Sequence, residues 1–170
     1  MDLKEKIRVI EDFPEPGVSF KDITTVLKNP DYLNEVINQL TDLFKEAQVD
    51  IVVGPESRGF IFGTPVAFNI GAGFVPVRKP GKLPSETVRF EYDLEYGKDA
   101  LEIHRDAIEK GMRVLIIDDL LATGGTVSAT AQLIESLGGE VVGIGFFIEL
   151  EELQGRKKIE AYNVKSIVKY

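Results

Sequence analysis

Residues 114–126 read Val-Leu-Ile-Ile-Asp-Asp-Leu-Leu-Ala-Thr-Gly-Gly-Thr, and this order constrains the fold more than any other stretch of the chain. The four apolar, β-prone residues at its start predict a short buried strand over 114–117. Two carboxylates and a small, Gly-rich turn follow, and an apolar pattern of helical period extends from Thr126 to about Leu137. A strand, a turn and a helix in this order indicate an α/β protein.

The Gly-rich turn is suited to binding a phosphate group. Its small residues let backbone N–H groups come close to an anion, its hydroxyls are further donors, and the following helix adds its positive N-terminal end. The residues concerned are Ala122, Thr123, Gly124, Gly125 and Thr126. The turn lacks the Gly-Lys-Ser/Thr ending of a P-loop and does not fit Gly-x-Gly-x-x-Gly, which disfavours ATPases and dinucleotide-binding proteins.

The adjacent carboxylates Asp118 and Asp119 need a different partner, because they would repel the same phosphate. Hydroxyl groups or a cation attached to the phosphate at some distance would suit them, and a ribose 5-phosphate has that form. Adjacent side chains in a strand point to opposite faces. We therefore expect the chain to leave the strand before these two acids, so that both can meet one ligand. An acid that caps the next helix is the alternative.

The rest of the chain repeats the alternation of strand and helix. Apolar runs predict strands over 50–54, 73–77, 113–117 and 141–148, and amphipathic segments predict helices over 32–47, 59–69 and 126–137. This order predicts a mainly parallel, twisted sheet flanked by helices, with ligands beyond the carboxyl ends of the strands. Gly138-Gly139 is expected to end the third helix.

Two regions interrupt this alternation. Residues 1–30, rich in Pro and Phe from 11 onwards, predict a small ordered cap, and 31–170 predict the core. Residues 78–99 are charged and begin with Pro and Gly, and an exposed hairpin could start at the alternating stretch 87–94. Such an excursion is either a flexible lid over a site or a plain surface hairpin, and composition leaves both open.

Composition limits the other classes of function. A chain of 170 residues fits one domain with a real core. It has no Cys, which suits a reducing compartment, and its net charge of −8 disfavours general nucleic-acid binding. The polar N-terminus and the lack of an apolar run of roughly 20 residues predict a cytoplasmic protein that does not enter a membrane.

The 114–126 run resembles the phosphoribosyl-pyrophosphate signature of the type I phosphoribosyltransferase family, with apolar strand, acid pair and phosphate loop in order. The resemblance extends along almost the whole chain, and is carried further by 12–23, 56–60, 78–84, 94–97 and 149–156. It implies that family's fold and, from the branch that it resembles most, the transfer of a 5-phosphoribosyl group from phosphoribosyl pyrophosphate to adenine. AMP and pyrophosphate would be the products of this purine-salvage reaction. It also implies a homodimer and Mg²⁺ held mainly by substrate oxygens and water, with no direct protein ligand.

The resemblance also implies roles for individual residues. Asp118 and Asp119 would hold the ribose hydroxyls and favour positive charge on the sugar, while the 122–126 loop binds the 5-phosphate. Glu95 is the candidate for proton transfer at the purine, and Tyr96 would help to close the site. The pyrophosphate is assigned to Glu56, Ser57, Arg58, Lys79 and Lys82, with a cis peptide between Glu56 and Ser57. The base is assigned to Ser19, Phe20, Lys21 and Leu120.

Two alternatives remain open on the sequence. One is a phosphoribosyltransferase for 6-oxopurines or xanthine, with the same core and a different base pocket. The other is a non-catalytic regulator that senses phosphoribosyl pyrophosphate and binds nucleic acid; the net charge and the Glu95 loop weigh against it. The single histidine, His104, lies in a stretch that alternates like a strand, and we interpret it as structural or solvent-facing.

Overall fold

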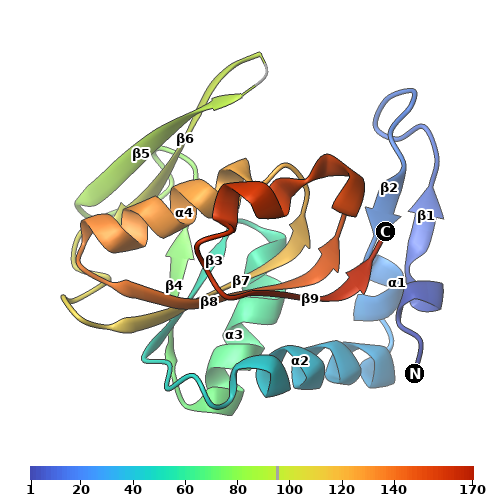
Figure 1. Cartoon of the computed structure of the whole chain (residues 1–170), viewed down its shortest axis with the longest axis horizontal. Helices are drawn as coiled ribbons and strands as arrows, with labels where there is room; N and C mark the ends of the chain where they lie inside the picture. The colour runs from blue at the N-terminus through green and yellow to red at the C-terminus, as the bar shows by residue number, and fades with distance from the viewer. Residues whose placement is uncertain (95) are drawn as a thin grey trace.

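The computed structural model describes residues 1–94 and 96–170, and at its centre lies a parallel sheet of five strands (Figure 1). The strand order is β4-β3-β7-β8-β9, and every neighbouring pair is parallel. The strands are β3 (Ile51–Pro55), β4 (Gly73–Val77), β7 (Arg113–Leu121), β8 (Glu140–Glu149) and β9 (Val164–Lys169). The predicted α/β class is confirmed; β9 is a strand that the sequence analysis did not identify.

Helices cover both faces of this sheet. Helices α2 (Pro30–Phe44) and α3 (Arg58–Ile70) pack on one face, in a core with Leu115 and Ile117. Helix α4 (Gly125–Ser136) packs on the other, in a core with Val114 and Ile116. The short helices are α1 (Thr24–Leu27), η1 (Lys4–Lys6), η2 (Glu151–Leu153) and η3 (Gly155–Ile159). Alternate residues of β7 therefore fill two cores, which explains why the strand reads as an unbroken apolar run.

Local signals set the ends of the helices. The Asn29 side chain accepts hydrogen bonds from the backbone N–H groups of Asp31 and Tyr32 at 3.0 and 3.1 Å, so α2 begins at Pro30, two residues before the predicted start. At the end of α4, Gly138 adopts the left-handed conformation with φ of 89°, as the predicted stop requires. Within the described residues, no helix is both long and apolar enough to span a bilayer.

Two antiparallel hairpins stand apart from the sheet and rise on opposite sides of the view in Figure 1. The first pairs β1 (Arg8–Ile10) with β2 (Phe20–Asp22). The second pairs β5 (Thr87–Leu94) with β6 (Gly97–His104), which confirms the hairpin expected from the alternating stretch. His104 accepts a hydrogen bond from the backbone N–H of Ser85 at 3.3 Å, in keeping with a structural role.

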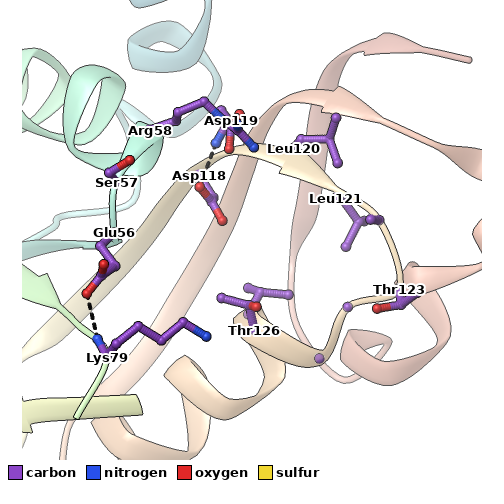
Figure 2. Close-up of a pocket in the computed structure, with 14 residues that line it drawn as sticks. Glu56, Ser57, Arg58, Lys79, Asp118, Asp119, Leu120, Leu121, Thr123 and Thr126 are labelled. Atoms are coloured by element: carbon purple, nitrogen blue, oxygen red, sulfur yellow. Dashed lines mark hydrogen bonds and ion pairs between the residues drawn. The ribbon is translucent and has the colours of Figure 1, made fainter. Parts of the chain in front are cut away.

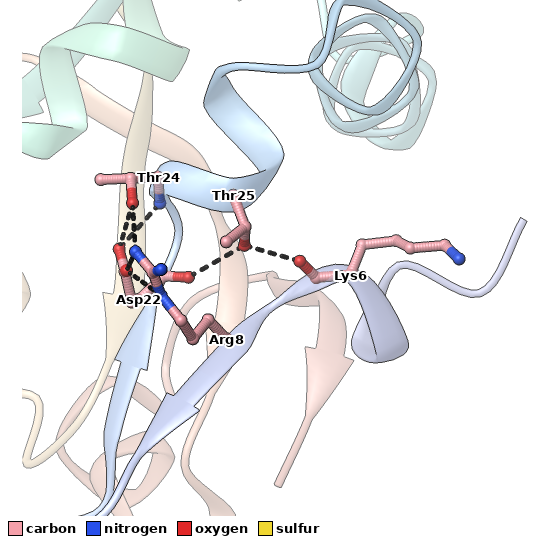
Figure 3. Close-up of polar contacts among 5 residues, drawn as sticks. All are labelled: Lys6, Arg8, Asp22, Thr24 and Thr25. Carbon is pink, nitrogen blue, oxygen red and sulfur yellow. Dashed lines mark hydrogen bonds and ion pairs between the residues drawn. The ribbon is translucent and has the colours of Figure 1, made fainter.

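Asp22 fixes the first hairpin to the chain that follows it (Figure 3). Its carboxylate accepts hydrogen bonds from the Thr24 backbone N–H at 2.9 Å and the Thr24 hydroxyl at 2.7 Å. It also accepts two from the Arg8 guanidinium, at 2.8 and 2.5 Å. The bonds from Thr24, supported by Arg8, lower the pKa of Asp22 to about 2. The charged Asp22 carboxylate therefore holds β2, the strand on which Phe20 and Lys21 lie, to Thr24 and to Arg8 of β1.

Candidate active site

A cavity of about 430 Å³ lies where β3 and β7 end and α3 and α4 begin (Figure 2). In parallel α/β sheets ligands bind beyond the carboxyl ends of the strands, so the position itself indicates a binding site. The cavity is lined by Glu56, Ser57, Arg58, Lys79, Asp118, Asp119, Leu120, Leu121, Ala122, Thr123, Gly124, Gly125, Thr126 and Val127. The acid pair, the Gly-rich loop and the turn after β3, far apart in sequence, thus meet in one place.

The acid pair lies inside a strand, so the prediction that the chain leaves the strand before it is wrong. Strand β7 continues past both acids because β8 goes on pairing with it, placing Asp118 opposite Phe146 and Leu120 opposite Ile148. Strand β3, by contrast, pairs only with 114–116. The end of β7 is therefore left without β3 on its other side, and both carboxylates line the cavity despite their opposite directions.

The two carboxyl groups differ in their electrostatic state. Asp119 is only 6% exposed, and its carboxylate accepts a hydrogen bond from Arg58 Nε at 2.5 Å. The Asp119 backbone N–H donates to Asp118 Oδ1 at 2.8 Å. Burial, followed by the neighbouring Asp119 charge, raises the pKa of Asp118 well above its ordinary value. Asp119 is thus an ion-paired hydrogen-bond acceptor, while Asp118 holds a proton more readily. This combination is suited to binding hydroxyl groups, which both donate and accept hydrogen bonds.

The Gly-rich loop takes the form of an anion site. Gly124 has φ of 86°, in the left-handed region that favours glycine, and it precedes α4 directly. In the part of the chain that the structure describes, no side chain caps this end of α4. The first N–H groups of the helix, which have no partner within the helix itself, are therefore available to an anion in the cavity.

The turn from β3 to α3 packs against the acid pair. A Cβ atom added to Gly59 would lie 3.0 Å from Asp118 Oδ1 and 3.2 Å from the Ile117 carbonyl oxygen, so only glycine fits without displacing them. The peptide between Glu56 and Ser57 is cis, as the resemblance implied. The Glu56 side chain accepts a hydrogen bond from the Lys79 backbone N–H at 2.6 Å (Figure 2). Glu56 therefore ties the turn to the start of the 78–99 excursion.

Asp99 and Tyr92 extend the site, and neither was predicted from the sequence. Lys79 Nζ donates a hydrogen bond to the Asp99 carboxylate. The Tyr92 hydroxyl lies 3.3 Å from the Asp99 carboxylate and 3.4 Å from the Thr126 hydroxyl. Only the hairpin register, which places Tyr92 opposite Asp99, could have revealed this network from sequence.

The same network sets the charge of Lys79. Burial acts to lower the pKa of Lys79, but the hydrogen bond to Asp99 and nearby negative charge outweigh it, so that the pKa is raised. The hydrogen bond from Lys79 in turn lowers the pKa of Asp99. Lys79 is therefore a fixed cation on the wall of the cavity, held by an acidic partner.

The residues assigned to the base lie apart from this cavity, except Leu120, which lines it. Phe20 packs edge-to-face on Phe13 with ring centroids 5.2 Å apart. Lys21 Nζ donates to the Ser19 hydroxyl at 2.8 Å and lies 4.4 Å from the centre of the Tyr170 ring. Ser19, Phe20 and Lys21 lie in β2 or directly before it, and none of them lines the cavity.

Three further residues named from the sequence belong to the 78–99 excursion. Lys82 Nζ lies 3.9 Å from Glu56 Oε2, outside the residues that line the cavity. The Tyr96 side chain is 90% exposed, at the hairpin tip. Glu95, the candidate for proton transfer, lies outside the described residues.

The cavity has few side chains that could bind Mg²⁺ directly. Among the described residues, no three His, Cys, Asp or Glu side chains are grouped so that they could hold a metal ion. The cavity offers two carboxyl groups, and Arg58 already binds one of them. Because Mg²⁺ prefers oxygen ligands and keeps several waters, this set fits an ion that takes most of its ligands from a phosphorylated substrate.

A phosphoribosyl transferase domain matches residues 22–170 of the chain. The match includes the sheet, the acid pair and the Gly-rich loop whose geometry is described above. The chain therefore belongs to the phosphoribosyltransferase family.

Within that family the chain is similar to adenine phosphoribosyltransferases. The one from Clostridium perfringens is 64% identical over 170 residues, covering 100% of this chain and 99% of that protein. The crystal structure of the Thermoanaerobacter pseudethanolicus enzyme has a TM-score of 0.97 at 54% identity, covering 99% of this chain and 98% of that one. The Saccharomyces cerevisiae enzyme, crystallised with adenine and an imino-altritol bisphosphate, has a TM-score of 0.91 at 40% identity, covering 97% and 96%.

Proposed function

We propose that the protein transfers the 5-phosphoribosyl group of phosphoribosyl pyrophosphate to N9 of adenine, giving AMP and pyrophosphate. The observation that carries the proposal is one cavity that joins an anion loop, an acid pair and a cationic turn. Each of these parts matches one part of the donor: its 5-phosphate, its ribose and its leaving group. Similarity to adenine phosphoribosyltransferases over the whole chain supports adenine as the acceptor.

The 122–126 loop binds the 5-phosphate in this proposal. Its support is the left-handed Gly124 and the start of α4, which no side chain of the described residues caps and which offers N–H donors and a positive helix end. Holding the phosphate there anchors the sugar at a point remote from the bond that breaks. The ribose then extends from the loop toward the two acids on the same wall of the cavity.

Asp118 and Asp119 act on the ribose. Departure of pyrophosphate leaves positive charge on C1 and the ring oxygen, as in other reactions with an oxocarbenium-like transition state. A fixed carboxylate near that charge stabilises the transition state more than the ground state, and this difference raises the rate. The ion-paired Asp119 supplies the negative charge, and Asp118, with its raised pKa, is suited to hydrogen bonds with the ribose hydroxyls.

The leaving pyrophosphate is bound by Arg58, Lys79 and Lys82 with the Glu56–Ser57 turn. Arg58 and Lys79 line the cavity, and Lys82 lies beside it, close to Glu56. Cations at this position stabilise the charge that develops on the leaving group. Mg²⁺, bound to substrate oxygens and water beside the acid pair, would neutralise further charge on the pyrophosphate.

The base site and its closure involve the two hairpins. Residues 1–30 form a cap that places Phe20 against one face of adenine and Leu120 against the other, with backbone groups at Ser19 and Lys21 reading its edge. Residues 78–99 form a flexible lid that carries Tyr96, and Glu95 takes up the proton that N9 loses. Closure of the lid would keep water from the reactive sugar.

A homodimer completes the proposal. Helix α3 exposes Ile61 and Phe68, which are seven residues apart and share a face of the helix. Phe68 is 86% exposed and Ile61 40%, and apolar residues that gather on one exposed face are typical of protein–protein contact surfaces. Light scattering in solution tests this; a monomer at micromolar concentration would contradict it.

The decisive test is AMP formation from labelled adenine, phosphoribosyl pyrophosphate and Mg²⁺. Unlabelled adenine should compete with the label, whereas hypoxanthine, guanine and xanthine should not. Efficient competition by a 6-oxopurine would assign a different base. Binding of phosphoribosyl pyrophosphate without any product from these bases would instead favour a sensor.

A further inference from the structure

The segment 149–156 contributes no residue to the cavity lining, yet it packs behind the Gly-rich loop. The backbone N–H of Leu150 donates to the Leu121 carbonyl at 3.0 Å, directly before the loop begins. Further on, Gly155 starts η3, which packs beside α4. Figure 1 shows this red segment running alongside α4.

Gly155 and the loop touch backbone to backbone. A Cβ atom added to Gly155 would collide with the Ala122 carbonyl oxygen and would lie 3.0 Å from the Gly124 backbone nitrogen. In the other direction, a Cβ atom on Gly124 would lie 2.5 Å from the Gly155 carbonyl oxygen. Real Cβ atoms essentially never come that close to backbone. Neither side can therefore acquire a side chain without moving the loop.

An ion pair between the partly exposed Arg156 and the buried Glu149 fixes Gly155 in this position. The next residue, Arg156, donates to Glu149 from Nε at 2.9 Å and from Nη2 at 2.5 Å, and from Nη1 to the Val164 carbonyl oxygen at 2.8 Å. Glu149 is 4% exposed and also accepts a hydrogen bond from the Ser166 hydroxyl at 2.5 Å. A bidentate Arg–carboxylate pair constrains direction as well as distance. The pair thereby connects the end of β8 and the start of β9 to Gly155, the residue behind the loop.

We propose that Gly155 and the Glu149–Arg156 pair are positioning residues that hold the 122–126 loop in its anion-binding shape before the ligand arrives. The inference rests on the proposed function, because it assigns the 5-phosphate to that loop. A loop already in its bound shape does not lose conformational freedom on binding, and affinity rises accordingly. This gain in affinity is local. It applies to ligands that carry the 5-phosphate and not to ligands bound at the turn after β3.

The test compares two ligands of the same protein. Ribose 5-phosphate reports on the loop, and pyrophosphate reports on the Arg58 side of the cavity. Isothermal titration of the Gly155→Ala variant should show ribose 5-phosphate binding weakened about 10-fold to 100-fold, comparable to the loss of affinity when residues that orient metal ligands are removed. Pyrophosphate should bind that variant as tightly as it binds the parent.

Two further variants keep the test decisive if Gly155→Ala does not fold. Arg156→Lys keeps the charge but removes the bidentate geometry, and it should show the same selective loss. Glu151→Gln is the matched control, because Glu151 pairs with Lys169 at 3.0 Å on the exposed side of the same segment. It should bind both ligands like the parent.

Each outcome bears on the proposal. Selective loss of ribose 5-phosphate supports it. An equal loss of affinity for both ligands would show that these residues have a merely structural role, and it would overturn the proposal. Parent-like binding of ribose 5-phosphate would also overturn the proposal. Failure of the proposed function would show in the parent protein itself, which would then form no AMP.

Discussion

The hydrogen bonds around Asp22 predict an acid-sensitive contribution to stability, which the substitution Asp22→Asn would remove. The carboxylate side chain is only 11% exposed, and it receives hydrogen bonds from Thr24 and Arg8. Asparagine keeps the size of the side chain but carries no charge. The exposed Glu15, in the connection between β1 and β2, provides the control substitution Glu15→Gln.

The magnitude follows from the pKa. A decrease from 3.8 to about 2 in the folded state, at about 1.36 kcal/mol per unit, corresponds to about 2 kcal/mol of unfolding free energy at neutral pH. Because the folded pKa is the lower one, this stability is fully present above 3.8 and is lost as the pH falls toward about 2. The bonds from Thr24 contribute most of it, since Arg8 is more than half exposed.

Urea unfolding followed by far-UV circular dichroism measures the effect. At neutral pH, Asp22→Asn should be about 2 kcal/mol less stable than the parent, and the difference should shrink as the pH is lowered toward about 3. Glu15→Gln should match the parent throughout. A difference that stayed constant with pH, or an Asp22→Asn protein as stable as the parent at neutral pH, would refute the reasoning.

Three further predictions concern the site itself. Asp119→Asn should fold normally and lower kcat by at least about 100-fold, as expected for loss of a charge that stabilises the transition state; near-normal turnover in the folded variant would remove the assigned role. Glu95→Gln should slow the chemical step in single-turnover rapid-quench measurements, and an unchanged rate would rule Glu95 out as the proton acceptor. Asp99→Asn should tighten pyrophosphate binding by roughly threefold in titration calorimetry, because Lys79 no longer has to leave an anionic partner; unchanged or weaker binding would show that Asp99 does not compete with the ligand.

The parts of the fold that the sequence predicted are those governed by local pattern. The strand over residues 73–77 has the predicted bounds, and the three long helices differ from prediction by one to three residues. Apolar periodicity and glycine stops act over a few residues, so they can be read along the chain. The same holds for the Gly-rich loop, whose residue types alone indicated an anion site.

The features that could not be predicted from the sequence depend on pairing between distant segments. β7 extends past Asp118 because β8 is long enough to pair with it, and no residue near Asp118 reports that length. Asp99 comes into contact with Lys79 only through the hairpin register. Gly155 matters only because Gly124 lies against it. Each of these features depends on a tertiary contact, and tertiary contacts override the local conformational preferences that can be read along the chain.

The hydrogen bond between Arg58 and Asp119 has a thermodynamic consequence. The half-exposed Arg58 joins the turn assigned to pyrophosphate with the acid assigned to the sugar, so the two subsites share one cation. A pyrophosphate that draws Arg58 away leaves more negative charge on the acid pair, and the pair then favours a cationic sugar more strongly. By linkage, a cationic sugar analogue and pyrophosphate must each increase the affinity for the other by the same factor. The Arg58–Asp119 contact therefore supplies the coupling that holds both fragments together while the bond between them is broken.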